Sequence, residues 1–232
     1  MNFTDRVILY FKKFPVTAVL LTLNTLMLFV VLLNGGFGIG SLVRNGGLVP
    51  ILITQENEYW RLLTSMFLHG SFFHFFFNTY FLYFFGRFTE QLIGSLRYSI
   101  VYLVSGLGAS VAVWLLGNPF VVTVGASGAL YGIMGGLVVL TYIKSHWFSY
   151  QGIRSIRMIA ILNVGLTVFS LMTDGSISFL GHVGGLVFGI ILTYLIIPKR
   201  PALKNYGSYG PPNDDRIVID MDDVSDDDIY EP

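Results

Sequence analysis

The sequence predicts an all-α protein that crosses a membrane several times, and three observations support this fold class. Of the 232 residues, 53% are hydrophobic and only 12% are charged, whereas soluble domains have about 25% charged residues. The mean hydropathy is +0.66. Six apolar stretches approach the roughly 20 residues that a helix needs to cross a bilayer. Such a chain cannot cover a water-facing surface with polar groups, so lipid is its expected solvent.

The expected membrane spans follow from these six stretches. They comprise residues 15–33, 63–85, 98–116, 120–143, 158–172 and 177–197, of which the fifth is the shortest. Residues 15–197 therefore form the expected membrane domain. Residues 1–14 precede it as a short N-terminal segment, and residues 198–232 follow it as a C-terminal tail.

Lysine and arginine are distributed unequally between the two sides of this predicted topology. Two of them, Arg44 and Arg61, lie on the side opposite the N-terminus. The other twelve lie on the N-terminal side: Arg6, Lys12, Lys13, Arg87, Arg97, Lys144, Arg154, Arg157, Lys199, Arg200, Lys204 and Arg216. Because basic residues concentrate on the cytoplasmic side of membrane proteins, we expect both termini in the cytoplasm.

The segments outside the spans differ in character. Residues 34–62 form the longest loop, on the outer side, and a loop of this length predicts local structure or a function. Residues 205–232 contain one arginine and nine acidic residues, which gives −8, whereas residues 1–204 carry +8. We expect this cytoplasmic tail to be a disordered, solvated extension, with a docking role as the alternative.

Several expectations follow from what the sequence lacks. It contains no cysteine, which excludes disulfides, a thiolate metal site and a cysteine nucleophile. Neither a cleavable signal peptide nor an Arg- and Ser-rich transit segment is visible at the N-terminus. We therefore expect a multi-pass protein of the cell membrane, with a bacterial plasma membrane favoured over a mitochondrion. No cofactor, metal ion or nucleic acid is expected.

Ser127 is the first candidate for chemistry within the membrane, where polar groups are costly and usually functional. It lies in Gly125-Ala126-Ser127-Gly128, after the β-branched residues 121–124, which are poor helix formers. We expect a helix to start near Ser127, which places the hydroxyl near the positive end of a helix dipole. Taken alone, the motif also fits helix packing, because serine and glycine are common at membrane helix contacts.

His182 supplies the expected general base for Ser127. The fourth and sixth spans run in the same direction, and the two residues are eighth and sixth in their apolar runs, so their depths are similar. Glycines recur every four residues in both spans, which allows close backbone contact. They are Gly128, Gly132, Gly136, Gly181, Gly185 and Gly189. A histidine bonded to Ser127 can take the serine proton and return it to a leaving amine.

Further polar residues have expected supporting roles. Tyr131 follows Ser127 by one turn and either packs on His182 or is an ordinary interfacial or core tyrosine. His74 and Asn78 share one face of the second span, and with the Ser127 backbone N–H they would form an oxyanion hole.

The expected catalytic unit is a dyad, because no carboxylate lies at membrane depth. Asp174, in the loop before the sixth span, is the alternative third group. His69 is expected to hold water or structure, and His146 lies on the opposite side of the membrane from Ser127.

Taken in order, these motifs resemble those of the rhomboid family of intramembrane serine proteases, over about residues 15–197. Four motifs carry the resemblance: Tyr59-Trp60-Arg61, His69-x4-His74-x3-Asn78, Gly125-Ala126-Ser127-Gly128 followed by Tyr131, and Gly181-His182-x2-Gly185-x3-Gly189. Each motif is weak alone, but the ordered set is specific.

The resemblance implies a six-helix bundle with a water-filled cavity open to the outside. It also implies an intramembrane serine endopeptidase whose substrates are mostly single-span membrane proteins with unstable helices. In this family the fifth span and the loop before the sixth are thought to gate substrate access.

The resemblance also implies roles for individual residues. Ser127 takes the place of the nucleophile and His182 that of the general base, with His74 and Asn78 as oxyanion contributors. Tyr131 takes the place of the tyrosine that packs on the histidine. Trp60 and Arg61 are either an interfacial anchor pair or, by the resemblance, a clamp for the first loop.

Rival functions predict features that this sequence does not have. A rhomboid-like pseudoprotease, which binds membrane proteins without cleavage, commonly lacks the serine or the histidine, and this chain keeps both. A transporter or channel would predict internal repeats or paired charges at mid-membrane. A zinc protease would predict a His-Glu-x-x-His pattern, which is absent from the sequence.

Overall fold

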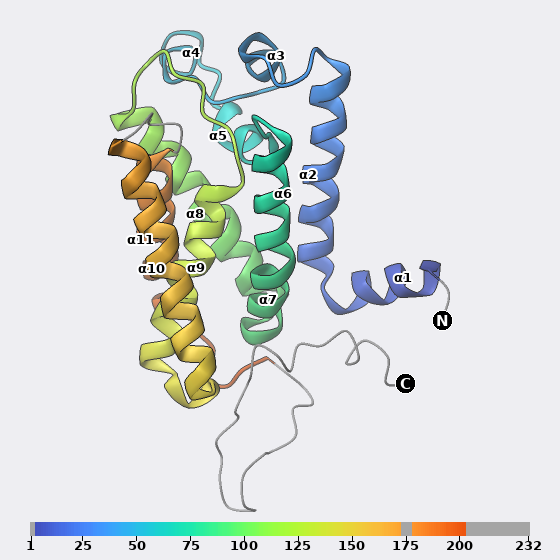
Figure 1. Ribbon diagram of the computed structural model, residues 1–232, viewed down its shortest axis with the longest axis vertical. Coiled ribbons are helices and arrows are strands. Elements are labelled where there is room, and N and C mark those ends of the chain that lie inside the picture. Colours follow the sequence, from blue (N-terminus) through green and yellow to red (C-terminus); the bar gives the residue numbers. More distant parts are fainter. Residues whose placement is uncertain (1–2, 173–177, 203–232) are drawn as a thin grey trace, which may run out of the picture.

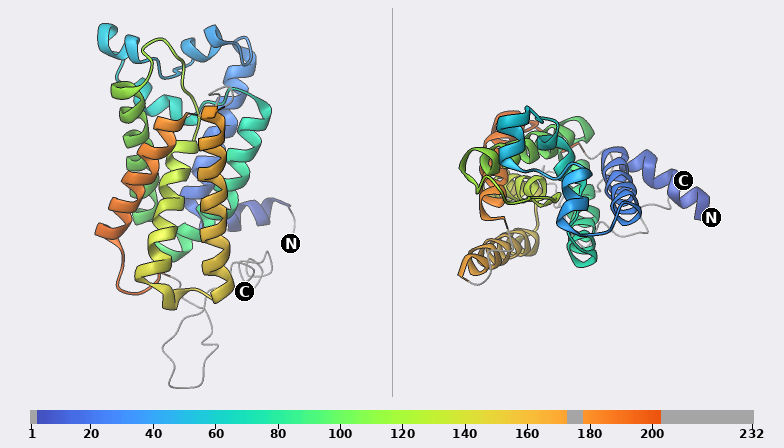
Figure 2. Two further views of the ribbon diagram at one scale, coloured as in Figure 1. Left: turned by 60° about the vertical axis from the view of Figure 1, so that its left-hand side comes forward. Right: turned by 90° about the horizontal axis from the view of Figure 1, so that it is seen from above.

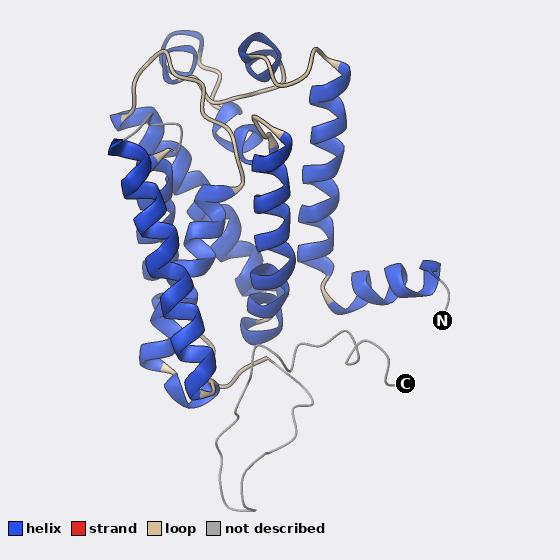
Figure 3. Ribbon diagram, in the orientation of Figure 1, coloured by secondary structure: helices blue, strands red, loops and turns tan. Residues whose placement is uncertain are grey.

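The structure is a computed structural model that describes residues 3–172 and 178–202. Within these residues all regular elements are helical, apart from an isolated bridge between Leu48 and Thr123 (Figure 3). Four helices are long and apolar enough to cross a membrane, and a further apolar helix is shorter. The predicted all-α polytopic membrane fold is therefore confirmed. The acidic tail from residue 203 and the loop residue Asp174 lie outside the described residues.

The helices form one bundle and alternate between its two ends (Figures 1 and 2). The long elements are α2 (Pro15–Leu33), the continuous set α6 (Phe72–Phe81), η2 (Leu82–Gly86) and α7 (Arg87–Ile93), then α8 (Ser95–Leu116), α9 (Ser127–Ile143), α10 (Tyr150–Met172) and α11 (Phe179–Ile196). The short ones are α1 (Phe3–Lys13), α3 (Ile39–Arg44), α4 (Pro50–Glu56), α5 (Arg61–Thr64), η1 (Ser65–Phe67) and η3 (Ser145–Trp147). The loop between α2 and α6 therefore has structure of its own, as its length predicts.

We call the end of the bundle that carries α1 the basic end, and the end that carries α3 to α5 the loop end (Figure 1). At the basic end, the Ala202 N–H donates to the Leu92 carbonyl at 2.9 Å and Arg97 Nε donates to the Ile196 carbonyl at 3.0 Å. Lys144 Nζ donates to the Lys199 carbonyl at 3.4 Å. The C-terminal ends of α7, α9 and α11 therefore lie at the same end as the start of α8.

The second span differs from the predicted residues 63–85 at both ends. Its helix begins at Phe72 because Ser71 is extended and its hydroxyl accepts the His74 N–H at 3.1 Å, which caps the helix. At the other end Arg87 is buried and its guanidinium lies over the Tyr83 ring, 4.6 Å from the centroid. This contact with an aromatic face accommodates the charge, so the helix continues to Ile93.

The fourth span is shorter than the predicted residues 120–143, because only Ser127–Ile143 is helical. In the preceding segment, Thr123 exchanges backbone hydrogen bonds of 2.8 and 3.0 Å with Leu48 of the first loop. β-Branched residues favour such extended backbone. The expected helix start near Ser127 is confirmed.

The fifth span is longer than the predicted residues 158–172, because α10 begins at Tyr150. The prediction excludes Arg157 as a charged residue. In the structure, Arg157 donates to the hydroxyl and the carbonyl of Thr141, both at 3.0 Å, and lies 3.8 Å from the Tyr142 ring centroid. These contacts with α9 let an arginine occupy the helix surface near the basic end.

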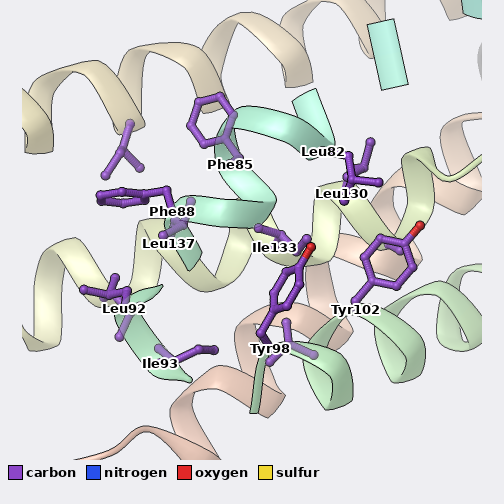
Figure 4. Packing of buried hydrophobic residues seen from close by; sticks show 14 of the residues in the cluster. Leu82, Phe85, Phe88, Leu92, Ile93, Tyr98, Tyr102, Leu130, Ile133 and Leu137 are labelled. Atoms are coloured by element: carbon purple, nitrogen blue, oxygen red, sulfur yellow. The ribbon is translucent and has the colours of Figure 1, made fainter. Parts of the chain in front are cut away.

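The main hydrophobic core surrounds α9, which is buried along most of its length. Figure 4 shows side chains of η2, α7, α8 and α9 meeting there. They include Leu82, Phe85, Phe88, Leu92, Ile93, Tyr98, Tyr102, Leu130, Ile133 and Leu137. The N-terminus of α9 is therefore held inside the bundle, and the first residue of that helix is Ser127.

Glu90 joins three helices at the basic end. Although it is only 3% exposed, its carboxylate accepts the N–H groups of Val16 and Thr17, at 2.9 and 2.8 Å. It also accepts the hydroxyls of Thr17 and Ser95, both at 2.7 Å. The first N–H groups of α2 have no intrahelical acceptor, and a carboxylate at this position also complements the helix dipole.

We expect Glu90→Gln to destabilise the protein by about 1–3 kcal/mol, because an amide cannot accept all four hydrogen bonds at a buried site. Thermal unfolding in detergent, followed by circular dichroism, measures the change. Glu56→Gln alters an exposed glutamate on α4 and serves as the matched control. Equal unfolding temperatures for the two variants would show that the Glu90 contacts contribute nothing.

Candidate active site

The glycines of α9 and α11 bring the two helix backbones into contact. A Cβ at Gly185 would collide with the Gly128 carbonyl, and one at Gly189 would collide with the Gly132 carbonyl. The close approach predicted from the four-residue spacing is therefore present. Only residues without a side chain permit this distance.

Ser127 and His182 face each other across this contact. Ser127 is the first residue of α9 and His182 is the fourth of α11. The His182 Nε2 lies 2.9 Å from the Ser127 hydroxyl oxygen, which is hydrogen-bond distance. His182 is 8% exposed. A serine and a histidine at this distance can exchange a proton.

The depth estimate from the sequence uses the starts of the two apolar runs, which are not the starts of the helices. It counts from residues 120 and 177, whereas the helices begin at Ser127 and Phe179. Both residues still lie within the first turn of their helices, at the loop end of the bundle. The pair therefore depends on where the helices begin and on the glycine contact, not on the lengths of the apolar runs.

The Tyr131 ring stacks on the His182 ring. Their centroids are 4.0 Å apart and the planes differ by 16°. The Tyr131 hydroxyl donates to the Asn163 carbonyl at 2.8 Å and lies 2.6 Å from the Thr167 hydroxyl. Of the two alternatives, packing against His182 is the one the structure contains. The stack fixes the plane of the imidazole.

Thr167 contacts the other ring nitrogen of His182. Its hydroxyl oxygen lies 2.9 Å from Nδ1, and the hydroxyl group donates to the Asn163 carbonyl at 3.1 Å. Sequence reasoning did not single out Thr167 or Asn163. A signal was present, because these two polar residues are four apart in an apolar span and therefore share one helix face.

His74 lies beside the backbone that leads into Ser127. Gly125 has φ +132°, and a Cβ there would lie 2.7 Å from His74 Nε2. The Gly70 N–H points at His74 Nδ1 over a long 3.4 Å. With Nδ1 as acceptor, the ring hydrogen is on Nε2, so this side chain presents a donor next to Gly125.

Asn78 is buried, and its amide donates to the His74 carbonyl at 3.0 Å. Its side chain is thus fixed to its own helix one turn before it. The His69 ring is also buried and packs edge-on against the His74 ring, with centroids 5.2 Å apart. His69 therefore supports the position of His74.

Arg61 is 4% exposed and holds segments of the first loop together. Its Nη1 donates to the carbonyls of Val43 and Gly47, at 2.7 and 2.8 Å, and its Nε pairs with Glu58. Its guanidinium also lies 4.5 Å from the Trp60 ring centroid. Because Leu48 follows Gly47 directly and pairs with Thr123, these contacts reach the segment before Ser127.

A small cavity of about 30 Å³ borders the Ser–His pair. Ser127, His182, Ser65, Ser110 and Ser178 contribute to its lining. A cavity of this size has room for a water molecule, and these polar side chains could bind it. Among residues 3–172 and 178–202, no three His, Cys, Asp or Glu side chains lie close enough to share a metal ion.

Comparison with known proteins identifies similar chains. A family model described as Rhomboid domain matches residues 56–199. "Rhomboid protease GluP" of Bacillus subtilis (strain 168) is 34% identical over 188 residues, which are 80% of this chain and 36% of that protein. "RHOMBOID-like protein 6, mitochondrial" of Arabidopsis thaliana is 30% identical over 178 residues, 73% of this chain and 55% of that protein. The chain thus spans between a third and just over half of these two relatives.

We expect Gly189→Ala to separate α11 from α9, because its methyl group would collide with the Gly132 carbonyl. Overpacking of this kind typically costs about 1–3 kcal/mol, which thermal unfolding in detergent measures. Gly165→Ala on α10 is the matched control, since a Cβ there meets nothing within 4 Å. If Gly189→Ala is as stable as Gly165→Ala, the glycine contact does not constrain the two helices.

Proposed function

Because the chain belongs to the rhomboid family, we propose that it is a serine endopeptidase that cleaves transmembrane segments within the bilayer. Ser127 is the nucleophile and His182 the general base. The observation that carries the proposal is the 2.9 Å distance between Ser127 Oγ and His182 Nε2 in a buried site. Tyr131 supports the base by stacking on its ring.

Catalysis then proceeds in two steps. The Ser127 oxygen attacks the scissile carbonyl carbon while His182 Nε2 takes the hydroxyl proton. The tetrahedral intermediate collapses, the carbon–nitrogen bond breaks, and His182 returns the proton to the leaving amine. Water then attacks the carbonyl carbon of the acyl-enzyme while His182 takes a water proton; the ester carbon–oxygen bond breaks, the new C-terminal acid leaves, and His182 returns the proton to the Ser127 oxygen. The small cavity beside the pair is a suitable position for that water.

His74 and the Ser127 backbone N–H are the proposed main donors to the oxyanion. His74 Nε2 lies beside Gly125, and Ser127 is at a helix N-terminus, where backbone N–H groups have no intrahelical acceptor. Asn78 has a second amide hydrogen besides the one given to His74, and this one completes the set. The missing side chain at Gly125 lets His74 lie close to the backbone before Ser127, and Gly128 lets α9 pack closely on Ala109 and α11.

The proposed substrates are membrane proteins, mostly with a single span. The backbone of a stable helix is already hydrogen-bonded and cannot extend into a protease site. Glycine, proline or small polar residues in a substrate span ease local unwinding. The lipid bilayer is therefore part of the reaction environment. No metal ion, cofactor or nucleic acid takes part in this mechanism.

We propose that both termini are cytoplasmic, in a bacterial plasma membrane. Basic residues gather at the basic end, whereas Arg44 and Arg61 lie in the elements of the loop end. The positive-inside rule then places the loop end, and with it Ser127, on the outer side. Cleavage falls in the outer half of the bilayer, and residues 198–232 extend into the cytoplasm.

The proposal predicts that a fluorophosphonate probe labels the wild type and fails to label Ser127→Ala. Cleavage of a model transmembrane substrate in liposomes is expected to stop in Ser127→Ala and in His182→Ala, because each removes one member of the proton-transfer pair. Gel fluorescence and product analysis measure the two effects. A wild type that binds the substrate without cutting it would instead identify a pseudoprotease.

We expect His74→Ala and Asn78→Ala to lower kcat by roughly 10²–10³-fold, the usual cost of losing an oxyanion donor. The matched control is His146→Ala, which removes an exposed histidine at the basic end. Steady-state kinetics on the same substrate measure the change. Unchanged kcat in His74→Ala would remove this residue from the oxyanion hole.

A further inference from the structure

We infer that Thr167 is a positioning residue for His182, so that the catalytic unit extends beyond the Ser–His pair. Its hydroxyl oxygen lies 2.9 Å from His182 Nδ1, on the ring side opposite Ser127. Thr167 is 3% exposed, so water does not compete for this contact. The inference rests on the proposed function: it specifies how the general base is held in the required tautomer.

The tautomer matters because His182 can accept the serine proton only when Nε2 is unprotonated. The ring hydrogen must then be on Nδ1 and needs an acceptor. In a Ser-His-Asp triad a carboxylate is that acceptor. Here the group within hydrogen-bond distance of Nδ1, in the described part of the chain, is the Thr167 hydroxyl.

The Asn163 carbonyl determines which groups donate in the hydrogen bonds around Thr167. The Asn163 carbonyl can only accept, and it lies 3.1 Å from the Thr167 hydroxyl and 2.8 Å from the Tyr131 hydroxyl. When both hydroxyl hydrogens are directed toward this carbonyl, the Thr167 oxygen keeps a lone pair that can accept the Nδ1 hydrogen. Once His182 takes the serine proton, both ring nitrogens carry hydrogen, and Thr167 must accept.

The hydrogen bond between Thr167 and His182 Nδ1 adds no charge, which suits a site at membrane depth. A carboxylate beside His182 would add a charge at membrane depth, where charged groups are costly. A hydroxyl that is itself bonded to a carbonyl stabilises the imidazolium without that charge. Other side chains of α10 are apolar and exposed, for example Leu162 (58%) and Leu166 (62%). The group that orients the base therefore comes from a peripheral helix, and base orientation depends on the position of α10.

Two substitutions separate the hydroxyl from the shape of the side chain. We expect Thr167→Val to lower kcat roughly ten- to a hundredfold with little change in KM, by analogy with the loss of a group that orients a metal-bound histidine. Thr167→Ser keeps the hydroxyl and is expected to retain most of the activity. Thr193→Val is the matched control, because it removes a buried threonine hydroxyl of α11 that has no hydrogen-bond partner among the described residues.

A spectroscopic measurement makes the test independent of catalysis. In full-length protein with ¹⁵N-labelled histidine, the His182 signals are assigned by their loss in His182→Ala. We expect an Nδ1–H tautomer in the wild type, in Thr167→Ser and in Thr193→Val, and a mixture of tautomers in Thr167→Val.

The outcomes separate this inference from the proposed function. Unchanged kcat and an unchanged tautomer in Thr167→Val would overturn the role of Thr167, and so would a Thr167→Ser variant as impaired as Thr167→Val. If the wild type cleaves no substrate, the proposed function fails. The tautomer comparison then still decides whether Thr167 orients His182.

Discussion

Contact between glycine backbones positions the polar groups of this site. Lipid does not drive apolar helix faces together as water does, so close van der Waals packing has to hold membrane helices in place. Gly185 and Gly189 of α11 lie against the carbonyls of Gly128 and Gly132 of α9. This packing sets the separation of the two helices, and the short distance between Ser127 and His182 follows from it. A side chain at any of these contacts would move one member of the pair away from the other.

Two different structures act on the pair from opposite directions. On the Ser127 side, Leu48 of the first loop pairs with Thr123. Arg61 donates to the carbonyls of Val43 and Gly47 in the same loop. On the His182 side, Tyr131 stacks on the ring and Thr167 contacts Nδ1. The contacts on the Ser127 side fix the backbone that precedes Ser127, whereas those on the His182 side fix the imidazole ring. Ser127 and His182 are therefore each held by further contacts in addition to the glycine contact between α9 and α11.

Sequence reasoning found what is encoded locally. Composition gives the membrane fold, and four-residue glycine spacing gives the helix contact that joins Ser127 to His182. It could not show how residues 121–124 pack, because an apolar β-branched run has the same hydropathy in either conformation until Leu48 pairs with Thr123. It excluded the charged Arg157 from the fifth span, because it could not show the contact with Thr141 of another helix that accommodates this charge. Glu90 and Thr167 were missed for the same reason, since their roles depend on contacts between distant segments.

The late start of α9 has a consequence for which bond is cut. Its 17 residues measure about 26 Å, less than the roughly 30 Å of a bilayer core, and the shortfall is on the Ser127 side if α9 ends level with its neighbours at the basic end. Ser127 then lies below the lipid headgroups, at a depth that the length of α9 sets. For a protease of the proposed kind, the depth of a peptide bond becomes a selection criterion alongside its neighbouring side chains. Two substrates with identical cleavage sequences would be told apart by how deeply each one sits in the membrane.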